Sequence, residues 1–418
     1  MSFRVVYPSE ASWKSSVDSF SVSANGLPAD KEQQLNKKSL SLALILFAAM
    51  SLVTTSPRAI QAQSDPEKPK VVERTANADF DGDGRSDFSV ARATGGVSPY
   101  LFEGPQQKVN RGVFSVRERL KLAKQDLDGT MSTEGIQWWV RYTDNSHKVF
   151  EVGRNASDFV TPSDFDGDGK TDIAVWRPGN EGEAAFIIFR SSDFTFDVQT
   201  IGKSGDDPAV IGDYDGDGKA DAAVYRCPSA SPGQCFFLFK KSANNPGGEI
   251  TSVALGFGID GDFYANPGDF DGDGKFDFCI QRARPGSSTG GQFVLIKSSN
   301  LGEEYINWGL ATDFLVPGDF DGDGKDDFTV LRIVNGKFVF WTLTRTGAIS
   351  TLQFGESGDV PTVGDYDGDG KADYAVWRPN PNNPDANFFW VRRSGDLGLT
   401  VFEWGLGDDF PVAAWNVH

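Results

Sequence analysis

Six copies of one nine-residue segment constrain the fold of this chain more than any other feature of its sequence. Each copy has aspartate at positions 1, 3, 5 and 9 and glycine at positions 4 and 6. Carboxylates this close together repel one another, so the chain needs something that holds them in place. The copies begin at Asp79, Asp164, Asp213, Asp269, Asp319 and Asp365 and read DFDGDGRSD, DFDGDGKTD, DYDGDGKAD, DFDGDGKFD, DFDGDGKDD and DYDGDGKAD.

The spacing of the aspartates predicts a calcium site in each copy. Calcium binds about six to eight oxygen atoms, and alternate positions of a tight loop turn their carboxylates toward one centre. The glycines let the backbone fold round the ion, and position 7 would add its carbonyl oxygen while its cationic side chain points outward. An apolar, β-rich segment follows each copy instead of the helix of an EF-hand, so we expect a loop between strands. An acidic turn without metal is the alternative.

We predict the same five ligand positions in all six loops, which would bind up to six calcium ions. The predicted ligands are Asp79, Asp81, Asp83, Arg85, Asp87, Asp164, Asp166, Asp168, Lys170, Asp172, Asp213, Asp215, Asp217, Lys219, Asp221, Asp269, Asp271, Asp273, Lys275, Asp277, Asp319, Asp321, Asp323, Lys325, Asp327, Asp365, Asp367, Asp369, Lys371 and Asp373.

The net charge of −19 is mostly the charge of these ligands. Positions 1, 3, 5 and 9 of the six loops hold 24 aspartates, and six divalent ions would leave a charge of about −7, which is ordinary for a soluble protein. No overall basic field would attract nucleic acid. With only two histidines, His147 and His418, a histidine-rich transition-metal site is not expected.

The N-terminal region has the pattern of a targeting segment. Two lysines precede an apolar run over residues 40–53, and Ala62 stands at a plausible cleavage site. We therefore predict an N-terminal extension and signal peptide over residues 1–62, a linker over residues 63–72, and a secreted or cell-surface protein, periplasmic or extracellular. An uncleaved signal anchor and a translation start near Leu35 are alternatives.

The three cysteines are compatible with export. Cys227 and Cys235 flank a turn-rich segment and could form a disulfide, whereas Cys279 is expected to be a buried free thiol.

From Asp79 onward the chain is built from repeats. Successive loops start 85, 49, 56, 50 and 46 residues apart. The third unit contains four short β-rich segments separated by turn signals. Four strands in a unit of this length predict an all-β fold, a β-propeller over residues 73–418, because a closed ring protects the edges of its sheets. We expect six blades; a seven-bladed ring and a linear solenoid are alternatives.

Two further sequence features bear on the structure of the ring. The C-terminal segment DDFPVAAW matches the strand that precedes each loop, so we expect it to close the ring. Trp176, Tyr225 and Trp377 share one strand position and are expected to pack between blades rather than to bind sugars.

A charge pair also recurs in step with the loops, and we interpret it as a ring of structural ion pairs between blades. Its arginines are Arg92, Arg177, Arg226, Arg282, Arg332 and Arg378, and its acids are Glu73, Asp158, Asp207, Asp262, Asp313 and Asp359.

The D-x-D-G-D-G-x-x-D loop, which follows PxxxGD and precedes an apolar strand, resembles the FG-GAP or VCBS-type repeats of bacterial secreted proteins. More distantly it is similar to the calcium-binding blades of integrin α-subunits. The resemblance covers residues 73–418 and implies a calcium-stabilised propeller whose loop aspartates are ligands. Such repeats occur in adhesins, in lectin-like proteins and in modules attached to enzymes.

The first unit differs from the others by an insertion over about residues 97–134. This insertion is locally basic, and we expect it to contact an anionic partner; a plain surface hairpin is the alternative. Its basic residues are Lys108, Arg111, Arg117, Arg119, Lys121 and Lys124.

The sequence thus predicts a secreted, calcium-stabilised binding or adhesion module for a glycan or an extracellular or cell-surface protein. No integral membrane span is expected after signal cleavage. A carbohydrate-active enzyme, a lyase or a hydrolase, and a purely structural surface module are the alternatives. No nucleophile elbow, phosphate-binding loop or redox motif is visible, so no catalytic residue is assigned.

Overall fold

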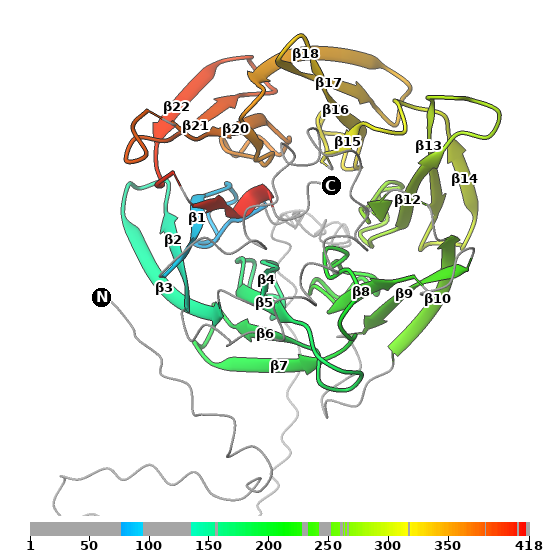
Figure 1. Ribbon diagram of the computed structural model, residues 1–418, viewed down its shortest axis with the longest axis horizontal. Coiled ribbons are helices and arrows are strands. Elements are labelled where there is room, and N and C mark those ends of the chain that lie inside the picture. The colour runs from blue at the N-terminus through cyan, green and yellow to red at the C-terminus, as the bar shows by residue number, and fades with distance from the viewer. Residues whose placement is uncertain are drawn as a thin grey trace, which may run out of the picture. The chain divides into compact units, whose positions relative to one another are not determined.

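The described residues form six β-sheets that follow one another round a ring (Figure 1). All of them belong to one compact unit of the chain. The computed structural model describes residues 77–94, 135–154, 158–227, 233–241, 252–259, 262, 264–265, 267–316, 318–380, 382–407 and 409–414. The predicted signal peptide, the linker and the insertion over residues 97–134 lie outside these ranges, so the boundaries assigned to them stay predictions.

Each sheet is one antiparallel blade, numbered here in chain order. Blade 1 has the strand order β23-β1-β2-β3, with β1 (Phe88–Ala93), β2 (Gly135–Arg141), β3 (His147–Arg154) and β23 (Phe410–Pro411). Blade 2 contains β4 (Phe159–Val160), β5 (Ile173–Arg177), β6 (Ala185–Phe189) and β7 (Phe196–Thr200). Blade 3 contains β8 (Ala223–Arg226), β9 (Gln234–Lys240) and β10 (Ser252–Ile259), and a β-bridge between Asp207 and Tyr225 takes the place of its innermost strand.

The other three blades have four strands each. Blade 4 contains β11 (Tyr264–Ala265), β12 (Phe278–Ala283), β13 (Gly291–Ile296) and β14 (Glu303–Ile306). Blade 5 contains β15 (Phe314–Leu315), β16 (Phe328–Val334), β17 (Lys337–Leu343) and β18 (Ile349–Glu356). Blade 6 contains β19 (Val360–Pro361), β20 (Tyr374–Arg378), β21 (Phe388–Arg392) and β22 (Leu399–Glu403). The predicted all-β propeller of six blades is confirmed, with a β-bridge in place of the fourth strand in blade 3.

The C-terminal segment closes the ring, as its sequence predicts. Strand β23 pairs with β1 through the register Val90↔Pro411 and Ala91↔Phe410, so blade 1 takes its innermost strand from the end of the chain. A short 3-10 helix, η2 (Val412–Ala414), follows and is buried. This pairing removes the open edges that a linear array of blades would expose.

The core lies between neighbouring blades. The second strands are apolar runs of β-branched and aromatic residues, such as IAVWR in β5, because both faces of the sheet are covered there. The residues of the outermost strands β7 and β22 are exposed or half-buried. Trp176, Tyr225 and Trp377 are 0%, 8% and 2% exposed, which confirms that they pack between blades.

The recurrent arginine lies within a blade rather than between blades. Its guanidinium binds an aspartate that precedes the innermost strand of the same sheet, at 2.6–2.9 Å, and the aspartates are at most 3% exposed. Our expectation of inter-blade pairs was therefore wrong. The pairs are Arg92–Asp409, Arg177–Asp158, Arg226–Asp206, Arg282–Asp262, Arg332–Asp313 and Arg378–Asp359.

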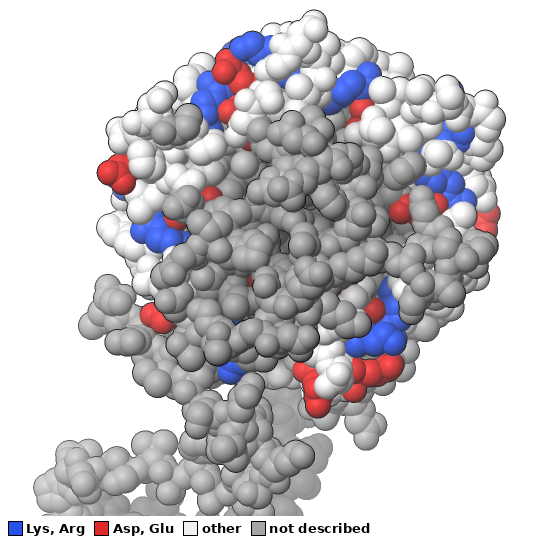
Figure 2. Space-filling model, viewed as in Figure 1, with Lys and Arg blue, Asp and Glu red and all other residues white. Residues whose placement is uncertain are grey.

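The same aspartates nevertheless connect one blade to the next. Arg154, Ile259 and Glu356 end the outermost strands β3, β10 and β18. Their backbone N–H groups donate at 2.7 Å to the aspartates that start the following blades, Asp158, Asp262 and Asp359. Each carboxylate therefore fixes the crossover between two blades as well as the arginine beside it. Basic and acidic side chains lie next to each other at several places on the face of the ring seen in Figure 2.

Cys227 and Cys235 form a disulfide that joins the end of β8 to β9, and Cys279 is a buried free thiol. Among the described residues, no helix has the length and apolar character needed to cross a membrane.

We predict that Asp359→Asn destabilises the propeller by about 2 kcal/mol, because it leaves the partly buried Arg378 without a full charge partner. The loss should appear as a lower midpoint of urea unfolding. Asp193→Asn is the control, because it removes an exposed pair with Arg190 and should leave the midpoint unchanged. Equal effects of the two substitutions would contradict the structural role of the buried pair.

Candidate metal centres

The backbone of each loop wraps round its first aspartate. The two oxygens of that carboxylate accept the N–H groups of the glycines at positions 4 and 6, at 2.6–3.1 Å in all six loops. The twelve glycines have φ between 75° and 87°. Other residues rarely adopt this left-handed conformation, so glycine at these positions is what makes the turn possible.

The ninth residue closes the loop from the other side. One oxygen of its carboxylate accepts the N–H of position 2 at 2.8–3.0 Å in every loop. In four loops the second oxygen accepts a backbone N–H from the hairpin between the third and fourth strands of the same blade, such as that of Ser191 at Asp172 (2.6 Å). In the first loop, Asp87 Oδ1 is buried and has no hydrogen-bond partner among the described residues.

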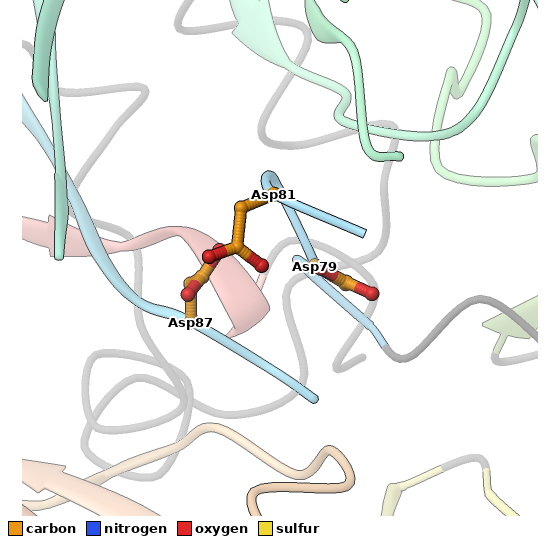
Figure 3. Close-up of side chains that lie close together, drawn as sticks. All are labelled: Asp79, Asp81 and Asp87. Atoms are coloured by element: carbon orange, nitrogen blue, oxygen red, sulfur yellow. The ribbon is translucent and has the colours of Figure 1, made fainter. Parts of the chain in front are cut away.

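Carboxylate oxygens of three aspartates lie within 4.8 Å of one another in at least five of the six loops. Figure 3 shows the first group, in which Asp79, Asp81 and Asp87 come from the loop that leads into β1. Five of the groups are Asp79, Asp81 and Asp87; Asp164, Asp166 and Asp172; Asp213, Asp215 and Asp221; Asp269, Asp271 and Asp273; and Asp319, Asp321 and Asp327.

The aspartate at position 5 makes a hydrogen bond within its own loop. Its carboxylate accepts the N–H of position 7 at 2.9–3.0 Å in all six loops. Of the five groups above, only that of the fourth loop includes position 5. The ligand roles of position 5 and of the position-7 carbonyl remain predictions.

Serine and threonine hydroxyls cover the loops, which our reading of the sequence missed. Ser192 Oγ donates to Asp166 and Ser299 Oγ to Asp271, both at 2.6 Å, and Thr143 Oγ1 donates to Asp83. The signal in the sequence is the pair of small hydroxyl residues, SSD or SSN, that follows the third strand in blades 2 and 4.

Burial and the nearby like charges disfavour the charged form of the loop carboxylates. Burial raises the pKa of the ninth carboxyl, and neighbouring loop aspartates raise it further. The pKa is raised to about 8 at Asp87, to about 7 at Asp172, Asp327 and Asp373, and to about 6 at Asp277. Burial also raises the pKa of the first aspartate in four loops, at Asp79, Asp164, Asp213 and Asp365.

The residues fit a hard divalent cation. The donors are carboxylate oxygens, which calcium prefers, and the buried Oδ1 atoms of Asp87 and Asp271 have no hydrogen-bond partner among the described residues. A bound ion would supply positive charge where the carboxylates crowd one another. The aspartates at positions 1, 3 and 9 would hold it in four of the five groups, and those at positions 1, 3 and 5 in the fourth loop.

The six loops are also joined to one another. The backbone N–H of position 8 donates to the carbonyl oxygen of position 1 in the loop of the preceding blade, at 2.5–2.8 Å. The last loop bonds to the first, so the bonds run round the whole ring; we call this set the loop hoop. Its donors and acceptors are Ser86–Asp365, Thr171–Asp79, Ala220–Asp164, Phe276–Asp213, Asp326–Asp269 and Ala372–Asp319.

The cationic side chain at position 7 does not simply point outward, as we expected. It lies over the position-4 glycine of the preceding loop, where a Cβ on Gly82 would come within 3.0 Å of Lys170 Cγ. The same contact occurs at Gly167 with Lys219. Glycine at position 4 therefore serves both the backbone conformation and the close approach of the next loop.

One segment of the chain matches a known repeat family. The FG-GAP-like repeat family matches residues 164–224, which run from the second loop into β8. A crystal structure of a triple arginine-to-alanine mutant of AofleA from Arthrobotrys oligospora is similar, with a TM-score of 0.42 and 11% identity over 66% of this chain and 85% of that chain. No curated protein matches the sequence. The chain carries an FG-GAP-like repeat on a six-bladed β-propeller.

We predict that removing calcium with excess EDTA lowers the melting temperature substantially. Each site adds about 2.7 kcal/mol of stability when free calcium is at 100 times its dissociation constant, and several sites act together. Differential scanning calorimetry in calcium, in magnesium and in EDTA measures the effect. An unchanged melting curve in EDTA would show that the loops are stable without metal.

We predict that Asp172→Asn removes one ion from the calcium-loaded protein. The substitution takes one negative charge from the second loop and leaves one of two backbone N–H groups without its acceptor. Native mass spectrometry should count one calcium fewer than in the parent. Asp197→Asn, on β7 outside the loops, is the control and should bind as many ions as the parent.

Proposed function

We propose that this protein is a calcium-stabilised binding or adhesion module of the cell exterior, with a glycan or an extracellular protein as its partner. The observation that carries the proposal is the loop hoop, in which six equivalent acidic loops are hydrogen-bonded head to tail. Sites that repeat in every blade and bond to one another serve the ring as a whole. The ring then acts as a rigid scaffold that presents a surface to a partner.

The surroundings of the loops support a structural role for the metal. A catalytic metal keeps a coordination position open for substrate or water. Here the first and ninth carboxylates are held by backbone N–H groups of their own loop, and hydroxyls such as that of Ser192 lie against the carboxylates at positions 3 and 5. Loops enclosed in this way favour stabilisation of the fold over turnover of a substrate.

Two observations support a location outside the cytoplasm. Calcium sites of extracellular modules are filled by the high calcium concentration found there, even when each site is weak. The disulfide between Cys227 and Cys235 is of a kind that persists in oxidising compartments. The apolar N-terminal run adds to both, as a segment expected to direct export.

Glycan-array and protein-capture measurements on the recombinant protein test the proposal. We expect specific binding in calcium and its loss in EDTA, because the surface depends on a ring that the metal holds together. Magnesium in place of calcium is the control for general divalent screening. A calcium-loaded, folded protein that captures neither a glycan nor an extracellular protein would contradict a binding function.

A further inference from the structure

A cavity of about 240 Å³ lies where blade 6 meets blade 1, on the side of the ring that carries the acidic loops. We call it the seam cavity, because the last acidic loop of the chain meets the first one there. Arg85 of the first loop and Asp367 of the last loop both line it. Its volume is below the roughly 300–1,000 Å³ of sites for drug-sized ligands, so it suits one sugar unit or a small anion.

The seam cavity contains two guanidinium groups. Arg85 stands at position 7 of its loop, where the other five loops have lysine, and its Nε lies over Gly368 of the last loop. Within the described part of the chain, the Arg85 side chain makes no hydrogen bond or ion pair. The second arginine, Arg393, binds Asp396 at 2.7 Å and lies 3.7 Å from Asp367. An exposed guanidinium group that has no partner among the described residues, and that lies near a second guanidinium group, is suited to bind a carboxylate.

The charge of the seam cavity depends on the last loop. Asp367 is a predicted metal ligand at position 3, and its carboxylate is the negative charge that lies between the loop and Arg393. A cation in that loop would neutralise the negative charge of Asp367. The positive charge of Arg85 would then have no acidic partner in the cavity, and Arg393 would be paired only with Asp396. The calcium-loaded cavity would therefore be positive on a protein that remains acidic overall.

The rest of the cavity wall suits a sugar ring. Phe88 stacks on Tyr366, with ring centroids 5.3 Å apart, and with buried Val391 these side chains form an apolar floor. The hydroxyls of Thr143 and Thr400 are at its exposed rim. An apolar floor with a few converging polar groups is the usual composition of a small-ligand site, and hydroxyls pair with sugar hydroxyls.

We propose that the seam cavity binds a carboxylate-bearing sugar unit, with the carboxylate on Arg85 and Arg393 and the sugar hydroxyls at Thr143 and Thr400. This inference rests on the proposed binding function and names the ligand class for it. An acidic polysaccharide would supply such units repeatedly along its chain. Five of the six loops have lysine at position 7, so the arginine at the seam distinguishes one site on an otherwise repetitive ring.

Isothermal titration of the full chain in calcium tests the proposal, with oligogalacturonate as the probe and neutral galacto-oligosaccharide of equal length as the comparison. We expect binding of the acidic oligomer and weakening by about tenfold or more in Arg85→Gln, since a hydrogen bond to a charged group is lost. Arg85→Lys should weaken binding less, and its melting temperature should match that of the parent. Lys170→Gln is the matched control, because Lys170 stands at position 7 of the next loop.

Three results would overturn the proposal. They are the absence of binding by the folded, calcium-loaded parent, equal weakening in Arg85→Gln and Lys170→Gln, and binding of acetate as tight as that of the oligomer. If the Arg85→Gln variant still captures the parent's partners on an array, the binding function stands and the seam cavity is not its site. Failure of the parent on every array would instead remove the proposed function.

Discussion

The mutual repulsion of the loop carboxylates is the constraint on which this structure depends. Each loop folds at least four aspartates into nine residues, and burial raises the pKa of the ninth residue in five of the loops. Backbone N–H groups supply part of the compensation, and a hard cation would supply the rest. The loops are hydrogen-bonded to one another in the loop hoop. Neutralising the carboxylate charge in one loop therefore also stabilises the two neighbouring loops.

Each blade is thereby fixed at both ends of its inner strands. At one end the loop hoop joins neighbouring blades through position 8 and position 1. At the other end a buried aspartate such as Asp158 binds the arginine of its own blade and the backbone that arrives from the preceding blade. Apolar side chains such as Trp176 and Phe186 fill the space between the sheets. Hydrogen bonds and ion pairs thus fix both ends of the inner strands, and an apolar layer packs between them. Such a ring can carry loops of variable sequence.

The sequence predicted the features that repeat in each blade, but it did not predict the contacts that join one blade to another. The period, the alternate aspartates and the copy of the inner strand at Phe410 were enough for the propeller, its six blades and its closure. The partner of Arg92 was assigned wrongly, because ring closure brings Asp409 from the far end of the chain. At Arg226 the spacing favoured Asp207, yet the preceding residue, Asp206, reaches the guanidinium.

The loop hoop and the seam cavity could not be predicted from the sequence, because both depend on contacts between different blades. A periodicity describes each unit separately, whereas the Ser86–Asp365 bond and the Arg85 contact with Gly368 join segments far apart in the chain. The grouping of the aspartates in each loop, in contrast, was predictable because they all lie within nine residues. Their occupancy by calcium remains a prediction from donor chemistry.

Hydrogen exchange of the six position-8 amides during a calcium titration tests the loop hoop most directly. These amides belong to Ser86, Thr171, Ala220, Phe276, Asp326 and Ala372. If metal binding closes the ring through the loops, all six amides gain protection together over one range of calcium concentration, including Ser86 at the seam. Protection that rises separately in each blade, or that is the same in EDTA and in calcium, would contradict a metal-dependent hoop.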